Sequence, residues 1–190
     1  MSRSPDARRT VAYLGGRGSF SEQACQQFLP TCALMPFPDF ASVARAVCQG
    51  SADVAVLPFR NSLAGPIDAV MALLGHPELR KVDEQELEVR LHLLAPRGTT
   101  IGAIREVASH GAALRQCAAF LAKRQIAAVE APSTAEAARQ IANDADPARA
   151  AIASEIAADI YGLTILARDV QGEAASVTRF AIVERRDQFA

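Results

Sequence analysis

Polar side chains near the end of the chain could combine a proton donor with a carboxylate-binding group. Thr178 and Arg179 open an apolar stretch, 180–183, that is typical of a strand. A hydroxyl beside a guanidinium could hold an acid and a carboxylate clamp together. Because β-branched residues are also common in strands for structural reasons, the pattern alone leaves both explanations open.

Four further segments place small or polar residues where a predicted strand gives way to a helix: 15–21, 61–65, 109–116 and 132–134. Ligands of α/β sheets bind at the carboxyl ends of strands, and helix N-termini there favour anions. Ser, Thr, Asn and Gly also act as ordinary caps and turns at such places. Four such segments in one small chain nevertheless favour an anion-binding cleft.

Short apolar runs alternate with amphipathic segments along the chain. Strands are expected at 11–14, 52–57, 88–94, 106–109, 126–130, 150–153 and 178–183. Helices are expected at 19–28, 41–48, 66–74, 111–123, 133–143 and 155–161. The alternation predicts an α/β fold with mainly parallel sheets, in which the charged stretch 80–86 crosses between two lobes.

Composition excludes several classes of function. The chain has 20 Lys plus Arg and 21 Asp plus Glu, so its net charge of −1 gives no nucleic-acid footprint. No apolar segment has the length of a signal peptide or a membrane span, which predicts a cytoplasmic protein without a membrane partner. Metal-ligand spacing is absent, so reduced, mostly buried thiols and no metal are expected for Cys25, Cys32, Cys48 and Cys117. No acid or nucleophile partner is evident in the sequence, and no catalytic role is assigned, for His76, His92 and His110.

Six groups of residues, in order across nearly the whole chain, resemble the motifs of prephenate dehydratases. They are 12–15 with 18–21, 52–58 with 61–65, 109–110 with 116–117, 133–138, 151–155 with 161–163, and 177–180. The resemblance implies a carbon–oxygen lyase (a hydro-lyase) that converts prephenate to phenylpyruvate in phenylalanine biosynthesis. It implies a homodimer that needs no cofactor. The ACT regulatory domain of most bacterial members is expected to be missing, so phenylalanine is expected neither to bind nor to inhibit.

The resemblance also implies a fold and a site. The expected fold is a two-lobed α/β fold similar to type II periplasmic binding proteins, with the active site in the cleft between the lobes. Lobe 1 would take about 1–83 and 171–190, and lobe 2 about 94–168. Catalytic roles are implied for Thr178, Arg179, Asn61, Ser109 and Gln116. Substrate-binding positions are expected at Ser21, Ser62, Ala64, Gly65, His110, Thr134 and Phe180.

Within that site, Thr178 is expected to meet the departing ring hydroxyl and Arg179 a substrate carboxylate. The chain departs from the family pattern at three positions. Arg60 replaces a Glu, Gly111 a Pro and Ser176 an Asn. Arg60 reverses the charge beside a site residue, which keeps open a prephenate decarboxylase-like lyase of a specialised pathway. The sequence also leaves open a non-catalytic protein that binds an anion in the cleft. It does not decide between prephenate and arogenate as the substrate, and it does not fix the oligomeric state.

Overall fold

The computed structural model describes residues 9–172 and 176–186. Residues 1–8, 173–175 and 187–190, which include both ends of predicted lobe 1, lie outside that description. The described chain forms two compact units. The first unit holds 9–15, 21–88 and 177–186, and the second holds 16–20, 89–172 and 176. The expected crossover at 80–86 instead lies inside a long strand, β5 (Leu79–Val89).

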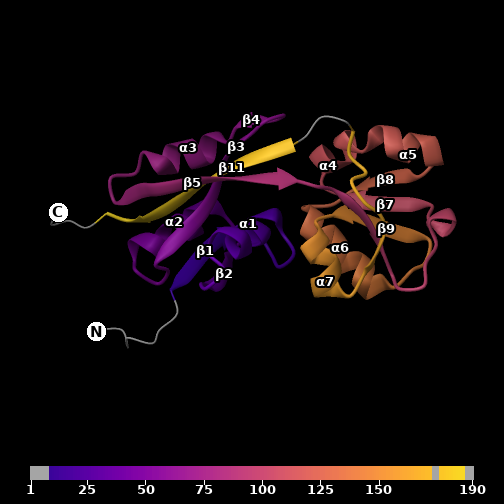
Figure 1. The fold of residues 1–190 in the computed structure, drawn as a ribbon, viewed down its shortest axis with the longest axis horizontal. Helices are drawn as coiled ribbons and strands as arrows, with labels where there is room; N and C mark the ends of the chain where they lie inside the picture. The colour runs from indigo at the N-terminus through magenta and orange to yellow at the C-terminus, as the bar shows by residue number, and fades with distance from the viewer. Residues whose placement is uncertain (1–8, 173–175, 187–190) are drawn as a thin grey trace. The chain divides into compact units, whose positions relative to one another are not determined.

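The sheet of the first unit has the strand order β2-β1-β3-β11-β5, with β4 paired to β3 (Figure 1). Its other members are β1 (Thr10–Leu14), β2 (Ala33–Phe37), β3 (Val54–Asn61), β4 (Gly65–Pro66) and β11 (Ser176–Arg185). β1 runs parallel to β2 and β3, whereas β11 and β4 run antiparallel to β3. The sheet is therefore mixed, and the expectation of mainly parallel pairing was wrong. The late strand β11 lies in the middle of the sheet because it is inserted between β3 and β5.

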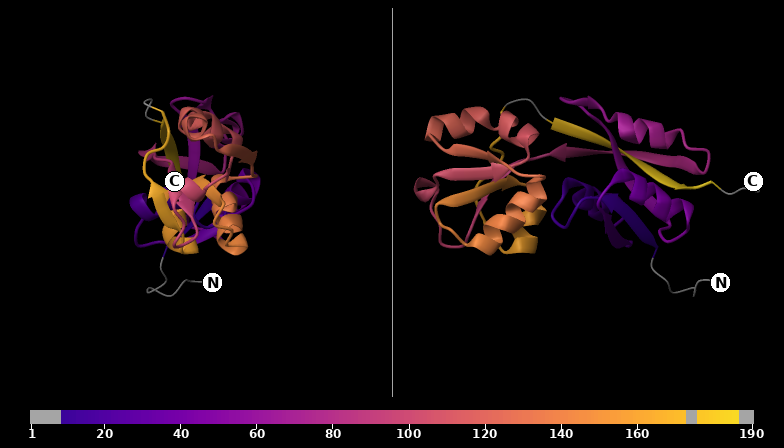
Figure 2. Two further views of the ribbon diagram at one scale, coloured as in Figure 1. Left: turned by 90° about the vertical axis from the view of Figure 1, so that its right-hand side faces the viewer. Right: turned by 180° about the vertical axis from the view of Figure 1, so that it is seen from behind.

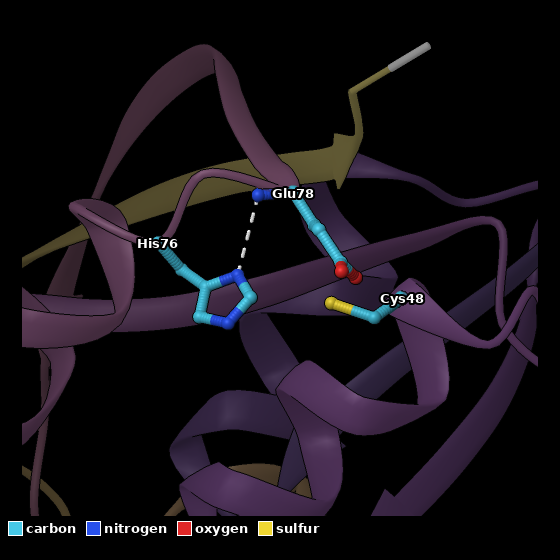
Figure 3. A group of neighbouring side chains, drawn as sticks. All are labelled: Cys48, His76 and Glu78. Carbon is cyan, nitrogen blue, oxygen red and sulfur yellow. Dashed lines mark hydrogen bonds between the residues drawn. The ribbon is translucent and has the colours of Figure 1, made fainter. Parts of the chain in front are cut away.

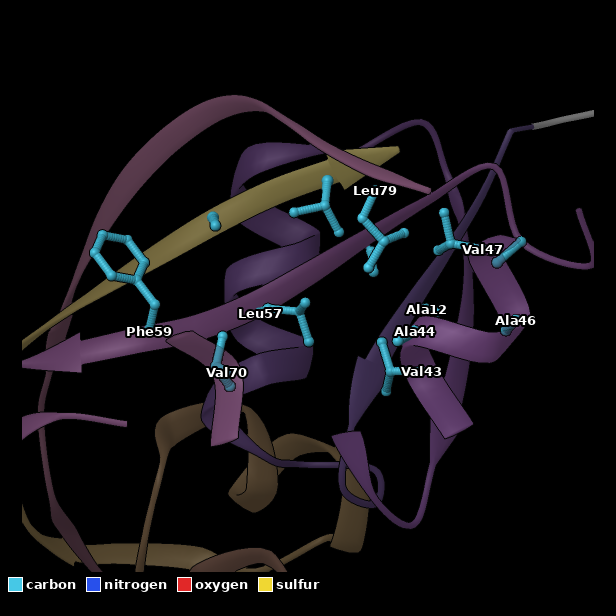
Figure 4. Packing of buried hydrophobic residues seen from close by; sticks show 13 residues of the cluster. Ala12, Val43, Ala44, Ala46, Val47, Leu57, Phe59, Val70 and Leu79 are labelled. Atoms are coloured by element: carbon cyan, nitrogen blue, oxygen red, sulfur yellow. The ribbon is translucent and has the colours of Figure 1, made fainter. Parts of the chain in front are cut away.

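Helices cover both faces of this sheet. α2 (Phe40–Cys48) and α3 (Asp68–Leu74) pack on one face, where Leu57 and Phe59 of β3 meet Val70 of α3 (Figure 4). Ala181 and Val183 of β11 belong to the same cluster, and Phe180 alternates with them. α1 (Phe20–Phe28) covers the opposite face, where the Phe28 ring lies edge-on to the Phe180 ring at 5.9 Å. Side chains of β11 therefore sort by parity between two helical layers.

The second unit has a sheet of its own, with the order β10-β6-β9-β7-β8. Its strands are β6 (His92–Ala95), β7 (Glu106–Ser109), β8 (Ala127–Glu130), β9 (Arg149–Ala153) and β10 (Thr164–Ala167), and a short 3₁₀ turn, η1 (Ile101–Ala103), precedes β7. β7 is parallel to β8 and β9, while β6 is antiparallel to β9 and β10. This sheet is also mixed.

Helices again form two layers around this sheet, as Figure 2 shows. They are α4 (Gly111–Gln116), α5 (Ala118–Arg124), α6 (Thr134–Asp144) and α7 (Glu155–Tyr161). Val107 packs with α4 and α5, whereas its neighbour Ala108 packs with α6 and α7. The single helix expected at 111–123 is two helices, because Cys117 leaves helical geometry at φ −101°, ψ 8°.

Buried polar groups in the second unit are largely structural. His92 is 3% exposed, and its Nδ1 accepts the backbone N–H of Asp169 at 3.1 Å. Burial lowers the pKa of His92, which favours the neutral ring in the folded chain.

Of the four cysteines, Cys25 and Cys117 are buried free thiols, but Cys32 and Cys48 are only half-buried. Across the described helices, none is long and apolar enough to cross a lipid bilayer.

Candidate active site

Asn61 and Thr178 form the centre of the candidate site in the first unit. The two residues lie directly opposite each other where β3 ends and β11 begins. Asn61 Nδ2 donates a hydrogen bond of 2.9 Å to Thr178 Oγ1. Thr178 is 8% exposed, so this contact is shielded from bulk water. Two of the predicted catalytic residues, 117 positions apart in the sequence, are therefore in direct contact.

The turn after β3 fixes which way the Asn61 amide points. Asn61 Oδ1 accepts the backbone N–H groups of Leu63 and Ala64, each at 3.0 Å. Gly65 completes the turn at φ +84°, a conformation that favours glycine. Because the amide oxygen is committed to these two donors, the amide nitrogen must face Thr178. Ala64 and Gly65 thus act on the site through the backbone.

The Thr178 hydroxyl is oriented by this contact. A hydroxyl has one proton to donate and two lone pairs that accept. Asn61 fills one lone pair of Oγ1, and in the part of the chain that the structure describes Oγ1 donates to no acceptor. The proton of Thr178 is consequently available to a group that enters the site.

Arg179 projects from the other face of β11, since neighbouring side chains of a strand alternate. Its guanidinium pairs closely with Glu84 of β5, lies 3.5 Å from Glu86 and stacks 5.5 Å from the Phe59 ring centre. The structure therefore does not bring the Thr178 hydroxyl and the Arg179 guanidinium to one face. Hydrogen bonds and charge from Lys81, and to a lesser degree Arg179, lower the pKa of Glu84, so this carboxylate stays ionised.

Arg60 lies directly opposite Arg179 in the β3–β11 register. Both arginines, with Ser62, Val177 and Glu86, line a pocket of about 360 Å³ on this face. Like charges placed opposite each other are unfavourable in a sheet. Glu84 and Glu86 balance Arg179, whereas no carboxylate among the described residues forms an ion pair with Arg60. The residues that line the pocket carry two positive charges and one negative charge, and this excess suits an anion.

Ser62 ties the two strands together beyond the pair of arginines. Its Oγ accepts the backbone N–H of Val177 at 3.0 Å, and its own N–H donates to the Val177 carbonyl at 2.8 Å. Ser62 therefore lines the pocket from the segment that follows β3. The other two positions predicted in this unit, Ser21 and Phe180, are buried, and Phe180 is a core residue at 1% exposure.

The remaining predicted residues lie in the second unit. Ser109 is fully buried, and its hydroxyl donates to the Ile152 carbonyl at 2.6 Å, so its proton serves the β7–β9 contact. His110 caps α4 by accepting the Ala112 N–H at 3.3 Å. Thr134 is the first residue of α6. The prediction that these residues face the same cleft as Thr178 stays a prediction.

Gln116 is half-buried, and its side-chain oxygen is a buried acceptor without a hydrogen-bond partner among the described residues. Its side-chain oxygen is shielded from solvent, and no donor in the described residues reaches it. Its backbone carbonyl accepts the N–H of Gly172 at 3.0 Å. Because an unpaired buried acceptor costs about 1–3 kcal/mol, the arrangement favours a ligand or water at this point.

Sequence reasoning matched the motif around 151–155 but gave its residues no role. Ser154 is fully buried, and its hydroxyl donates to the Gly18 carbonyl at 2.6 Å. Tyr161 Oη donates to the Arg17 carbonyl at 2.8 Å. These bonds hold the glycine-rich loop 16–20 on α7, in the second unit.

The sequence also gave no sign of the acids that pair with Arg179, Glu84 and Glu86 of β5. They lie in a charged stretch that was expected to be a crossover between lobes.

Known proteins are similar to this chain in sequence and in fold. Residues 11–188 match the family model described as prephenate dehydratase. The chain is 42% identical over 179 residues to an arogenate dehydratase/prephenate dehydratase 2 of Arabidopsis thaliana, covering 94% of this chain and 47% of that protein. It is 40% identical over 179 residues to an arogenate dehydratase 2 of Petunia hybrida, covering 94% of this chain and 45% of that protein. It spans about half the length of these two relatives.

Solved structures of prephenate dehydratases have a similar fold. A prephenate dehydratase from Arthrobacter aurescens, solved in complex with L-Phe, superposes with a TM-score of 0.85 at 29% identity. The match covers 94% of this chain and 61% of that one. A prephenate dehydratase from Staphylococcus aureus gives a TM-score of 0.83 at 26% identity, covering 95% of this chain and 68% of that one. The mixed two-sheet α/β fold is therefore a fold that solved prephenate dehydratases share.

Proposed function

This chain belongs to the prephenate dehydratase family, and we propose that it is a carbon–oxygen lyase that converts prephenate to phenylpyruvate. Its place would be phenylalanine biosynthesis. The observation that carries the proposal is the Asn61–Thr178 hydrogen bond, which presents an oriented hydroxyl with an uncommitted proton. Such a group is what the departure of a ring hydroxyl requires.

The proposed reaction balances without an oxidant or reductant. The bond from the ring to its carboxylate breaks, and its electron pair moves into the ring as CO₂ leaves. The carbon–oxygen bond at the opposite ring position breaks, and the hydroxyl leaves as water once it gains a proton. Thr178 would donate a hydrogen bond to that oxygen as negative charge develops on it. A threonine is a weak acid in water, so its contribution depends on positioning in a shielded site.

Arg60 and Arg179 would supply the field that draws in the dianionic substrate. Their pocket keeps the charge of Arg60 unbalanced among the described residues. A direct carboxylate clamp on Arg179 would require the guanidinium to leave Glu84 and to reach the face of β11 on which Thr178 lies. In the second unit, Gln116, His110 and Thr134 would position the substrate, with the unpaired acceptor of Gln116 receiving a donor. Ser109 would act indirectly, through the bond of its hydroxyl to the Ile152 carbonyl.

Arogenate is the second candidate substrate, because both plant relatives carry arogenate dehydratase in their names. Arogenate has an ammonium group where prephenate has a keto group, so its net negative charge is smaller. An unbalanced Arg60 favours the more negative molecule, which is prephenate. We therefore propose prephenate as the preferred substrate.

The product distinguishes the candidate functions. We expect the purified chain to form phenylpyruvate from prephenate, read by its absorbance in alkali, and to form phenylalanine from arogenate more slowly. A non-aromatic keto acid from prephenate would assign the chain to decarboxylases. Specific binding of prephenate without turnover would leave only an anion-binding protein.

We propose a cytoplasmic homodimer that needs no cofactor, in keeping with the family motifs. Sedimentation velocity at several concentrations would test the dimer. A single species at the mass of one chain, 20.2 kDa, would contradict it.

A further inference from the structure

A cysteine, a histidine and a glutamate meet in the first unit, away from Thr178 and Arg179. Cys48 is the last residue of α2, His76 follows α3, and Glu78 directly precedes β5. One ligand atom from each side chain lies within 4.8 Å of the other two. Figure 3 shows the three side chains directed toward one another. We propose that Cys48, His76 and Glu78 form a binding site for a zinc ion.

The donor set suits zinc. Thiolate, imidazole and carboxylate are the three side-chain ligands that Zn²⁺ uses, whereas Mg²⁺ and Ca²⁺ prefer oxygen donors alone. A thiolate and a carboxylate also carry the two negative charges that neutralise the ion. Three protein ligands leave the fourth tetrahedral position to water, and His76 and Glu78 are solvent-exposed at this point.

The local backbone presents the histidine in a suitable form. His76 Nδ1 accepts the backbone N–H of Glu78 at 3.3 Å, so this nitrogen carries a lone pair. That length is at the weak end of the hydrogen-bond range, so an ion that takes the lone pair displaces little. Leu79 N–H bonds to the His76 carbonyl at 3.1 Å and holds the turn in place.

The distances need only a small contraction. Zinc bonds of about 2.0–2.3 Å in a tetrahedron put ligand atoms roughly 3.3–3.8 Å apart. The side chains of His76 and Glu78 are exposed, so rotation can close the remaining gap. They line a pocket of about 380 Å³ with Cys48, Arg45 and four other residues, which leaves room for an ion and its water.

The charges around the thiol are compatible with a cation. Burial raises the pKa of Cys48, and the Glu78 carboxylate raises it further, so the empty site holds a thiol. Zinc would displace that proton to solvent, as metal ions do with coordinating thiols. Arg45 and Arg185 are the nearby cations, and both are exposed, so salt and water screen their repulsion.

Sequence spacing could not indicate this site. His76 and Glu78 are two positions apart in a turn, and Cys48 lies on a separate helix. Only the packing of α2 against the turn before β5 brings the thiol to them. A bound ion would tie three segments of one unit together, so we expect zinc to raise its thermal stability.

Calorimetric titration of Zn²⁺ into the metal-free chain tests the proposal. We expect one ion per chain, and at least about tenfold weaker binding in Cys48→Ser and in His76→Ala. Co²⁺ gives a second readout, because a thiolate bound to it adds a near-ultraviolet charge-transfer band. This band should vanish in Cys48→Ser and persist in Cys32→Ser, which alters another half-buried thiol.

Three results would overturn the zinc site: no saturable zinc binding, a cobalt band that survives Cys48→Ser, or a band lost in Cys32→Ser. Circular dichroism of each variant separates a lost ligand from a lost fold, and exposed His76 provides a substitution with little structural cost. The titrations contain no prephenate, so their outcome is independent of the proposed lyase activity.

Discussion

Replacement of Thr178 by valine separates the chemistry of the hydroxyl from its contribution to folding. Valine keeps the β-branched shape and the strand propensity of threonine but has no hydroxyl. In the structure the change removes the 2.9 Å bond from Asn61 Nδ2. It removes with it the proton proposed to meet the leaving hydroxyl.

The two effects differ in size. A neutral hydrogen bond contributes about 0.5–1.5 kcal/mol to folding, a small part of the roughly 5–15 kcal/mol that holds a domain folded. For a chain of this size a loss of about 1 kcal/mol lowers Tm by about 2–4 °C. Loss of an acid–base group costs roughly 10²-fold or more in kcat. Thr178→Val should therefore remain folded at 25 °C and be nearly inactive.

Steady-state kinetics with prephenate, paired with thermal melts, measure both effects. Thr178→Ser is the matched variant, because it keeps a hydroxyl for Asn61 and should retain much of kcat. Near-normal kcat in Thr178→Val, with an unchanged circular dichroism spectrum, would refute the role of this hydroxyl. A variant that has lost both fold and activity would be replaced by Asn61→Asp, which keeps the turn acceptor and removes the donor to Thr178.

Arg60→Glu should raise KM for prephenate more than it lowers kcat, and the rise in KM should become smaller as the salt concentration increases. An unchanged KM at low ionic strength would show that Arg60 does not take part in substrate binding. Gly18→Ala should lower the free energy of unfolding by roughly 1–3 kcal/mol, measured with denaturant, because φ is +81° and the new Cβ would lie 3.1 Å from Ala157. Gly16→Ala is the control and should lower it little, since the new Cβ would meet no atom within 4 Å. Equal losses in the two variants would contradict this reason. The pKa of His92 in the folded chain is below its ordinary value of 6.5, so the unfolded chain takes up the proton first and the free energy of unfolding should fall as the pH drops below 6.5. His92→Gln should make the free energy of unfolding depend less on pH in this range. The same pH dependence in the variant would contradict the role of His92.

Much of the fold could be predicted because its apolar periodicity is strong. β7, β9 and α7 lie close to their predicted bounds, and their small apolar residues form the buried layers of the second unit. β5 could not be predicted, since most of its residues are exposed and charged, as suits a strand at the edge of a sheet. The predicted end of β3 at Pro58 was wrong, because a register shift beside Phe180 accommodates the proline.

The residue types of the candidate site could be predicted from the sequence, but the directions in which their side chains project could not. The motifs placed Asn61 and Thr178 at strand ends, and the structure joins them by a hydrogen bond. The opposite faces taken by Thr178 and Arg179 follow from strand alternation, but only the pairing with β5 shows which acids meet the arginine. The cross-strand position of Arg60 depends on the β3–β11 register, which a sequence does not fix.

The fate of the ring in prephenate shows whether the chain is a dehydratase. Carbon-13 NMR of labelled prephenate, incubated with the purified chain and a chelator, would follow the ring and both carboxylates together. We expect phenylpyruvate and CO₂ in equal amounts, at a rate that falls by roughly 10² in Thr178→Val. CO₂ released with the ring left non-aromatic, or prephenate left unchanged by the folded chain, would contradict it.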